Sequence, residues 1–162
     1  KEITFLNRGI SGDRVKDLKK RWKEDCLDLN PDVVSILIGI NDCWRRYDSN
    51  DPTSVEDFKK GYRNLLIKIK DNLSAQVILC EPFLLPVKEE QKIWREDLDP
   101  KIQAVRDLAR EFRTQYIPLD GIFSRLSTKR KPAFWAADGV HPTQAGHAVI
   151  AKNWLKTVEN NR

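Results

Sequence analysis

The stretch Val33–Ile38 constrains the fold more than any other part of the sequence. It is β-branched and almost wholly apolar, with a proline shortly before it and a glycine directly after it. A strand without polar alternation is typical of a parallel sheet, in which helices cover both faces. Three further short apolar runs are predicted as strands: Ile3–Leu6, Gln76–Cys80 and Tyr116–Leu119.

Longer segments with apolar residues at helical spacing separate these runs. The predicted helices begin after a capping Asp13, at the capping-box sequence Thr53–Glu56, at Asp99 with Pro100 as the first helical residue, and at Thr143. The segment from Gly39 to Pro52 is predicted as a polar loop. Alternating strands and helices predict an α/β domain with a mostly parallel sheet, and residues 1–162 have the length of one domain. Such sheets bind ligands at the carboxyl ends of their strands.

Composition excludes several classes of protein. Apolar residues make up 40% and charged residues 33%, which is typical of a globular chain, and no apolar run reaches the ~18 residues of a membrane span. The net charge of +5 is spread along the chain, which predicts a solvated surface and no nucleic-acid partner.

The sequence has three cysteines, Cys26, Cys43 and Cys80. They are odd in number and widely spaced, so neither a disulfide framework nor a zinc site is predicted. Reduced thiols favour a cytoplasmic location.

The sequence Asp138-Gly139-Val140-His141-Pro142 lies in a loop that enters the last predicted helix. A turn here would fold the Asp138 carboxylate onto Nδ1 of His141, which fixes the tautomer and leaves Nε2 free as a general base. The alternative is a capping aspartate beside a surface histidine. The other histidine, His147, lies within the helix and is predicted to be structural.

Two more loops at the same predicted edge carry candidate donors. Asn41 follows the most apolar strand, where its side-chain N–H₂ would stabilise an oxyanion; the alternative is an ordinary turn asparagine. The loop Asn7–Asp13 holds two glycines that would let backbone N–H groups face a ligand. Ser11 in this loop does not fit the Gly-x-Ser-x-Gly pattern of a nucleophile, so a turn role is favoured for it.

Together these loops resemble the SGNH (GDSL-type) esterase/lipase family. The matching residues are Gly9, Asn41, Asp138 and His141, and the resemblance spans most of the chain. It implies a flavodoxin-like three-layer α/β/α sandwich and a serine esterase. In that reading His141 is the base, Asp138 orients it, and Gly9 and Asn41 form the oxyanion hole. No metal or organic cofactor is implied.

The family's nucleophile is a serine in a Gly-Asp-Ser motif, and this motif does not occur here, since Gly12-Asp13 is followed by Arg14. We therefore expect the serine, and the family's first and central strand, to lie about forty residues or fewer upstream of Lys1. Residues 1–162 alone are expected to be inactive.

The predicted substrate is a small ester, such as an acetyl group on a sugar or an aryl alcohol. Trp44, Phe83, Phe134 and Trp135 are the candidate substrate-binding residues, with packing of the loops onto the core as the alternative. Two other functions stay open. The chain could be a non-catalytic binding module of the same fold, or a flavodoxin-like phosphate or nucleotide binder that uses the loop between Gly9 and Gly12.

Overall fold

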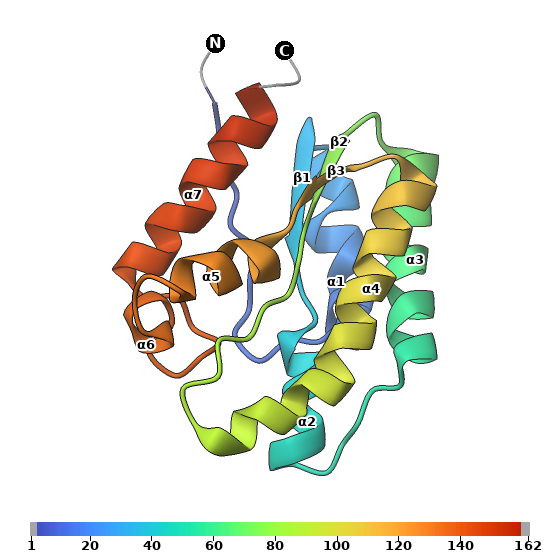
Figure 1. Ribbon diagram of the computed structural model, residues 1–162. Helices are drawn as coiled ribbons and strands as arrows, with labels where there is room; N and C mark the ends of the chain where they lie inside the picture. The colour runs from blue at the N-terminus through green and yellow to red at the C-terminus, as the bar shows by residue number, and fades with distance from the viewer. Residues whose placement is uncertain (1–2, 160–162) are drawn as a thin grey trace.

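The structure is a computed structural model that describes residues 3–159. Its sheet has three strands in the order β1-β2-β3, and both pairs are parallel (Figure 1). The strands are β1 (Val33–Leu37), β2 (Gln76–Cys80) and β3 (Gln115–Ile117). The predicted α/β fold with a parallel sheet is therefore confirmed.

Helices cover both faces of this sheet, which gives a three-layer α/β/α sandwich (Figure 1). One face carries α1 (Val15–Asp25), α3 (Val55–Asn72) and α4 (Arg95–Phe112), and the other carries α5 (Leu119–Ser127) and α7 (Gln144–Glu159). No helix within residues 3–159 has both the length and the apolar character needed to cross a bilayer.

The core has a layer on each face because successive side chains of a strand point in opposite directions. Leu79 packs with Phe58 of α3 and Leu108 of α4, whereas its neighbour Ile78 packs with Phe123 of α5. All of these side chains are fully buried, and each contributes about 1.5–3 kcal/mol to folding. The three cysteines are also buried and are not paired with one another.

Four short helical segments lie in the connections: η1 (Leu27–Leu29), α2 (Ile40–Asp48), η2 (Glu89–Trp94) and α6 (Pro132–Trp135). The helix α2 was not expected, and the prediction of a polar loop from Gly39 to Pro52 is wrong. Ile40, Cys43, Trp44 and Tyr47 lie at helical spacing, and their apolar side chains pack against η2 and α4. The charged residues between them hide this stripe in the sequence.

The helix α4 begins at Arg95, so Asp99 is not its N-cap. η2 runs directly into α4, and Pro100 lies inside the helix. Asp99 instead forms an ion pair with Arg95, one turn earlier in the helix, at 2.6 Å. The predicted strand Tyr116–Leu119 also shifts toward the N-terminus, because Leu119 is already the first residue of α5.

The predicted strand Ile3–Leu6 is absent. Ile3, Phe5 and Leu6 are each more than half exposed, and their backbone joins no ladder within the described chain. A strand needs a neighbour to satisfy its N–H and C=O groups, and this extended segment does not pair with β1. The outer edge of β1 is correspondingly unpaired, and Val33 and Leu37 are exposed.

Candidate active site

The turn before α7 brings Asp138 and His141 together. One carboxylate oxygen of Asp138, Oδ1, accepts the backbone N–H groups of Val140 at 3.1 Å and His141 at 2.8 Å. The other, Oδ2, lies 2.6 Å from Nδ1 of His141. This contact places the imidazole proton on Nδ1, so Nε2 is left as a proton acceptor. The side chain of His141 is 66% exposed, which makes Nε2 accessible to a reacting group.

Two hydrogen bonds from the segment after β2, one from the backbone and one from a side chain, hold this turn in place. The N–H of Leu85 donates to the carbonyl of Gly139 at 2.9 Å, and Nε2 of Gln91 donates to the carbonyl of Asp138 at 2.6 Å. Gly139 has a φ of 93°, and a Cβ there would lie 2.6 Å from the carbonyl oxygen of Leu85. Only glycine therefore fits, because the backbone is left-handed and the space is filled. Gln91, which is buried on η2, carried no signal in the sequence.

The electrostatics of the turn favour an ionised Asp138. Partial burial raises the pKa of this carboxyl, but the hydrogen bonds from the His141 ring and from the N–H groups of His141 and Val140 lower it by more. The net pKa lies below its ordinary value of 3.8. A carboxylate that stays charged can stabilise an imidazolium, which is what an orienting residue beside a general base must do.

Asn41 lies in the first turn of α2, at the carboxyl end of β1. The N-cap of this helix is Gly39, whose φ of 127° allows the sharp change of direction from strand to helix. Trp44 follows Asn41 by three positions, so the two share one side of the helix. The ring of Trp44 contacts the ring of His141, with 5.9 Å between centroids. The helix that carries Asn41 and the turn that carries His141 therefore meet at the same edge of the sheet.

The loop of Gly9 is exposed, and its N–H is already engaged. It donates to Oδ1 of Asn7 at 2.9 Å. Asn41 reaches the end of this loop, because its Nδ2 donates to the backbone carbonyl of Asp13 at 3.1 Å. Ser11 is exposed within a turn, and none of the hydrogen bonds among residues 3–159 joins it to His141.

The four predicted substrate-binding side chains differ in their contacts. Trp44 touches His141, whereas Phe83 is buried with its ring 4.5 Å from that of Phe123, so its contacts are those of core packing. Phe134 is 43% exposed on α6 and packs edge-on against Trp135, which in turn packs toward α7. Sequence reasoning missed Trp94, whose ring supports Trp44 at a centroid distance of 5.5 Å.

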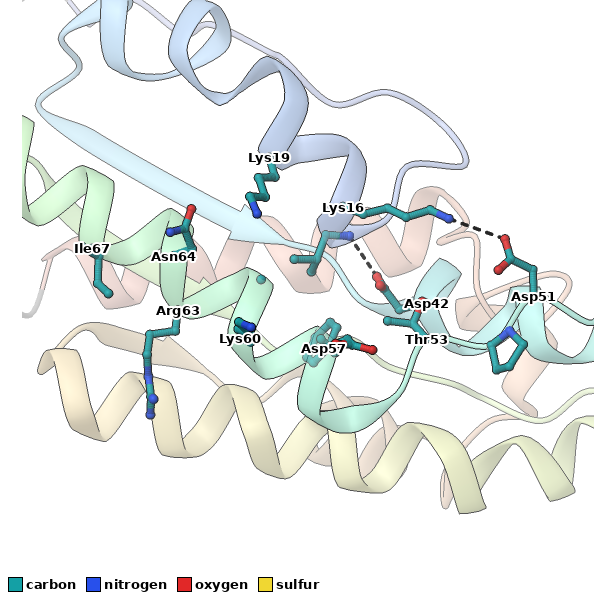
Figure 2. A pocket seen from close by; sticks show the side chains of 14 residues that line it. Lys16, Lys19, Asp42, Asp51, Thr53, Asp57, Lys60, Arg63, Asn64 and Ile67 are labelled. Atoms are coloured by element: carbon teal, nitrogen blue, oxygen red, sulfur yellow. Dashed lines mark hydrogen bonds and ion pairs between the residues drawn. The ribbon is translucent and has the colours of Figure 1, made fainter.

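A separate groove of about 580 Å³ runs between α1 and α3 (Figure 2). Lysine and arginine side chains line it, and none of the four predicted catalytic residues does. At one end Oδ2 of Asp42 accepts a hydrogen bond from the N–H of Val15 at 3.1 Å, which ties α2 to the start of α1. Within the described part of the chain, no three His, Cys, Asp or Glu side chains form a group that could hold a metal ion.

Comparisons with known proteins agree with this geometry. The model of the GDSL-like lipase/acylhydrolase family matches residues 2–149. An acetylxylan esterase of Geobacillus stearothermophilus is 34% identical over 160 residues, which are 96% of this chain and 72% of that protein. Its crystal structure aligns with a TM-score of 0.86 over 94% of this chain and 71% of that one. A structure described as a GDSL-like lipase of Parabacteroides merdae is 37% identical, with a TM-score of 0.89 over 93% of this chain and 71% of that one.

Three structures of the Geobacillus esterase are described as catalytic mutants, in which alanine replaces a histidine, a serine or an aspartate. In that protein the aspartate precedes the histidine by three positions, which is the spacing of Asp138 and His141. Its serine precedes the aspartate by more than the 137 positions that precede Asp138 in this sequence. On the family match, the two relatives and the fold, the chain belongs to the GDSL-like lipase/acylhydrolase family and is an ester hydrolase.

Proposed function

We propose that the full-length protein removes small acyl groups, such as acetyl groups on a sugar, through a serine acyl-enzyme. The observation that carries this proposal is the 2.6 Å contact between Oδ2 of Asp138 and Nδ1 of His141, on an accessible turn that contacts Trp44 of α2. The nucleophile is a serine outside residues 1–162. The spacing of the three catalytic positions in the Geobacillus esterase supports this placement.

In the first half of the reaction, Nε2 of His141 takes the serine proton while the serine oxygen attacks the ester carbonyl. The tetrahedral intermediate collapses, the bond to the alcohol breaks, and the imidazolium returns the proton to the leaving alcohol oxygen. In the second half, water loses a proton to Nε2, attacks the acyl-enzyme and releases the carboxylic acid. The proton then returns to the serine. Asp138 keeps the imidazole in the tautomer that both halves require.

The oxyanion of each tetrahedral intermediate is stabilised by the N–H of Gly9 and the side chain of Asn41, together with the N–H of the serine. Asn41 has two N–H bonds, and only one is needed for the carbonyl of Asp13. Gly9 has a single N–H, so it must leave or share Oδ1 of Asn7 as the oxyanion forms.

The proposed substrate class follows from the side chains beside the base. Trp44 presents an aromatic surface next to His141, and aromatic rings suit the apolar face of a sugar or an aryl alcohol. The name of the Geobacillus relative, an acetylxylan esterase, supports an acetylated sugar. The three buried thiols support a reducing compartment such as the cytoplasm.

A fluorophosphonate, which phosphonylates activated serines, tests the mechanism on the full-length protein. We expect one adduct, located by mass spectrometry on a serine outside residues 1–162, together with a burst of p-nitrophenol from p-nitrophenyl acetate. The His141→Ala variant should show neither. An adduct on Ser11 would overturn the placement of the nucleophile, and an unlabelled, inactive full-length protein would favour a non-catalytic binding module.

A further inference from the structure

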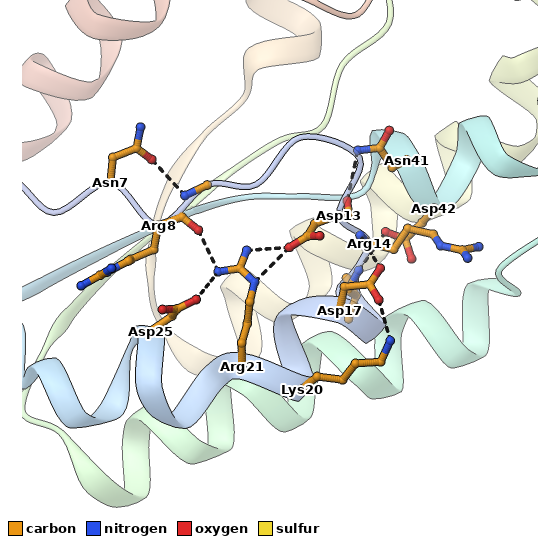
Figure 3. Close-up of polar contacts among 12 residues, drawn as sticks. Asn7, Arg8, Asp13, Arg14, Asp17, Lys20, Arg21, Asp25, Asn41 and Asp42 are labelled. Atoms are coloured by element: carbon orange, nitrogen blue, oxygen red, sulfur yellow. Dashed lines mark hydrogen bonds and ion pairs between the residues drawn. The ribbon is translucent and has the colours of Figure 1, made fainter.

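One guanidinium connects α1 to the loop that carries Gly9 (Figure 3). Nη1 of Arg21 donates to the backbone carbonyl of Arg8 at 2.8 Å and to Oδ2 of Asp25 at 2.6 Å. Nε and Nη2 of Arg21 both donate to Oδ2 of Asp13, at 3.0 and 2.6 Å. The side chains of Arg21 and Asp13 are each 17% exposed, so water screens these contacts less than it screens a surface ion pair.

The carbonyl that Arg21 holds belongs to the peptide unit that donates from Gly9. A peptide unit is planar and trans, so its C=O and its N–H point in opposite directions along fixed lines. Anchoring the carbonyl oxygen of Arg8 therefore sets the direction of the Gly9 N–H. A hydrogen bond from a cation to the carbonyl also polarises the unit, which strengthens the N–H as a donor.

The second proposed oxyanion donor is tied to the same side chain. Arg21 holds the carboxylate of Asp13, and the backbone carbonyl of Asp13 accepts Nδ2 of Asn41. Asp13 was predicted to cap α1, but the N-cap is Arg14, and Asp13 serves this network instead. Both donors thus depend on residues that one guanidinium fixes.

Regular secondary structure does not fix this loop. Residues 3–10 form no helix or strand, and every one of them is exposed. The guanidinium fork of Arg21 supplies the missing constraint, because it binds a carbonyl and two carboxylates from one rigid plane.

We propose that Arg21 is a positioning residue for the oxyanion hole. It anchors the Arg8–Gly9 peptide directly and the side chain of Asn41 through Asp13. This inference rests on the proposed roles of Gly9 and Asn41. Arg21 itself touches neither the substrate nor the reacting atoms.

The kinetic test compares Arg21→Lys with Lys23→Ala in the full-length protein. Lysine keeps the charge but has no fork, so it cannot hold Arg8, Asp13 and Asp25 together. We expect kcat for p-nitrophenyl acetate to fall about 10–100-fold with KM changed less than about 3-fold, since a small misplacement of a transition-state donor costs up to about 10²-fold. Lys23 makes a comparable ion pair with Asp28 on the exposed face of the same helix, and its loss should leave kcat unchanged.

A second measurement does not need activity. In the full-length protein, the amide ¹H–¹⁵N resonance of Gly9 should move in Arg21→Lys and stay in place in Lys23→Ala. If the wild-type protein hydrolyses no ester, the proposed function fails, but this resonance still decides whether Arg21 anchors the peptide. An unmoved Gly9 resonance, or a loss of kcat matched by an equal loss in Lys23→Ala, would overturn the inference. If Arg21→Lys does not fold, Asp25→Ala, which removes one carboxylate partner of the guanidinium, replaces it. The expected changes in kcat and in the Gly9 resonance are then smaller.

Discussion

Two loops at the same edge of the sheet are held in different ways. Residues 136–142 are fixed mainly by main-chain hydrogen bonds, by a glycine packed against Leu85, and by a bridge between Ala136 and Pro142, with one side-chain contact from Gln91. Residues 7–14 are largely exposed, and side chains of α1 and α2 hold them. The proposed base and its orienting residue are thus held mainly by the backbone, whereas the proposed oxyanion donors depend on a few side-chain contacts.

The largest expected effect lies in the loop held mainly by the backbone. In the full-length protein, His141→Ala should lower kcat by at least about 10³-fold, as loss of a triad base does. The matched control is His147→Ala, since His147 is exposed on α7 and the histidine ring that contacts the Asp138 carboxylate is that of His141. Steady-state kinetics with p-nitrophenyl acetate measures both. Equal losses in the two variants would show that His141 has no special role.

The loop held by side chains should give the next largest effect. Asn41→Ala removes one proposed donor to the oxyanion, and we expect kcat to fall about 10²–10³-fold. It also frees the carbonyl of Asp13, so the loop gains mobility. Asn72→Ala is the control, because Nδ2 of Asn72 donates to a backbone carbonyl at 2.8 Å on the exposed end of α3. A fall of less than 10-fold in Asn41→Ala would contradict the oxyanion role.

Two glycine substitutions, one in each loop, should differ in how much they lower the free energy of unfolding. Gly139→Ala strains a left-handed backbone and drives a methyl group into the carbonyl of Leu85, so we expect a loss of about 2–4 kcal/mol. Gly9→Ala should cost less than about 1 kcal/mol, because its nearest contact is the side chain of Asn7 at 3.2 Å, which can move. Denaturant unfolding of both variants measures the difference. Equal losses would remove the contrast between the loops.

Much of the fold could be predicted from the sequence because its signals are local. The apolar runs of β1 and β2 and the capping sequence before α3 specify their elements, and Ser54 does cap α3 by accepting the N–H of Asp57. The prediction of a strand at Ile3–Leu6 failed because a strand also needs a partner, and apolar composition alone does not supply one. The helix α2 was missed because its apolar stripe lies among charged residues.

The candidate site divides in the same way. The contact between Asp138 and His141 could be predicted because a turn of three residues makes it. Gln91 and Arg21 could not, because they reach the loops across 47 and 13 positions of sequence, and only the folded chain brings them there. Phe83 was a candidate for the substrate pocket, yet sequence pattern does not distinguish a loop aromatic that faces the core from one that faces a ligand.

The smallest expected effect concerns pH, and it contrasts Asp42 of α2 with Asp138. Burial raises the pKa of Asp42 from 3.8 to about 6, against the lowering by the N–H of Val15 and by Lys101 and Arg14. The pKa of Asp138 is instead lowered. A carboxyl with a raised pKa in the folded state favours folding fully below pH 3.8, and this contribution is lost as the pH rises through about 6. For Asp138 the contribution is present above pH 3.8 and is lost as the pH falls below it.

Asp42→Asn keeps an oxygen that can accept the N–H of Val15 but removes the ionisation. The free energy of unfolding of the variant relative to the wild type should therefore rise by about 1–2 kcal/mol between pH 4 and pH 7, below the ~3 kcal/mol that the full shift of about two pKa units would allow. Asp138→Asn should lose stability relative to the wild type as the pH rises toward 3.8 from below, which is the opposite slope. Urea unfolding at each pH gives both differences. If the relative unfolding free energies of the two variants changed with pH in the same direction, ionising Asp42 would cost no more than ionising Asp138. The proposed difference between these two carboxyls would then be wrong.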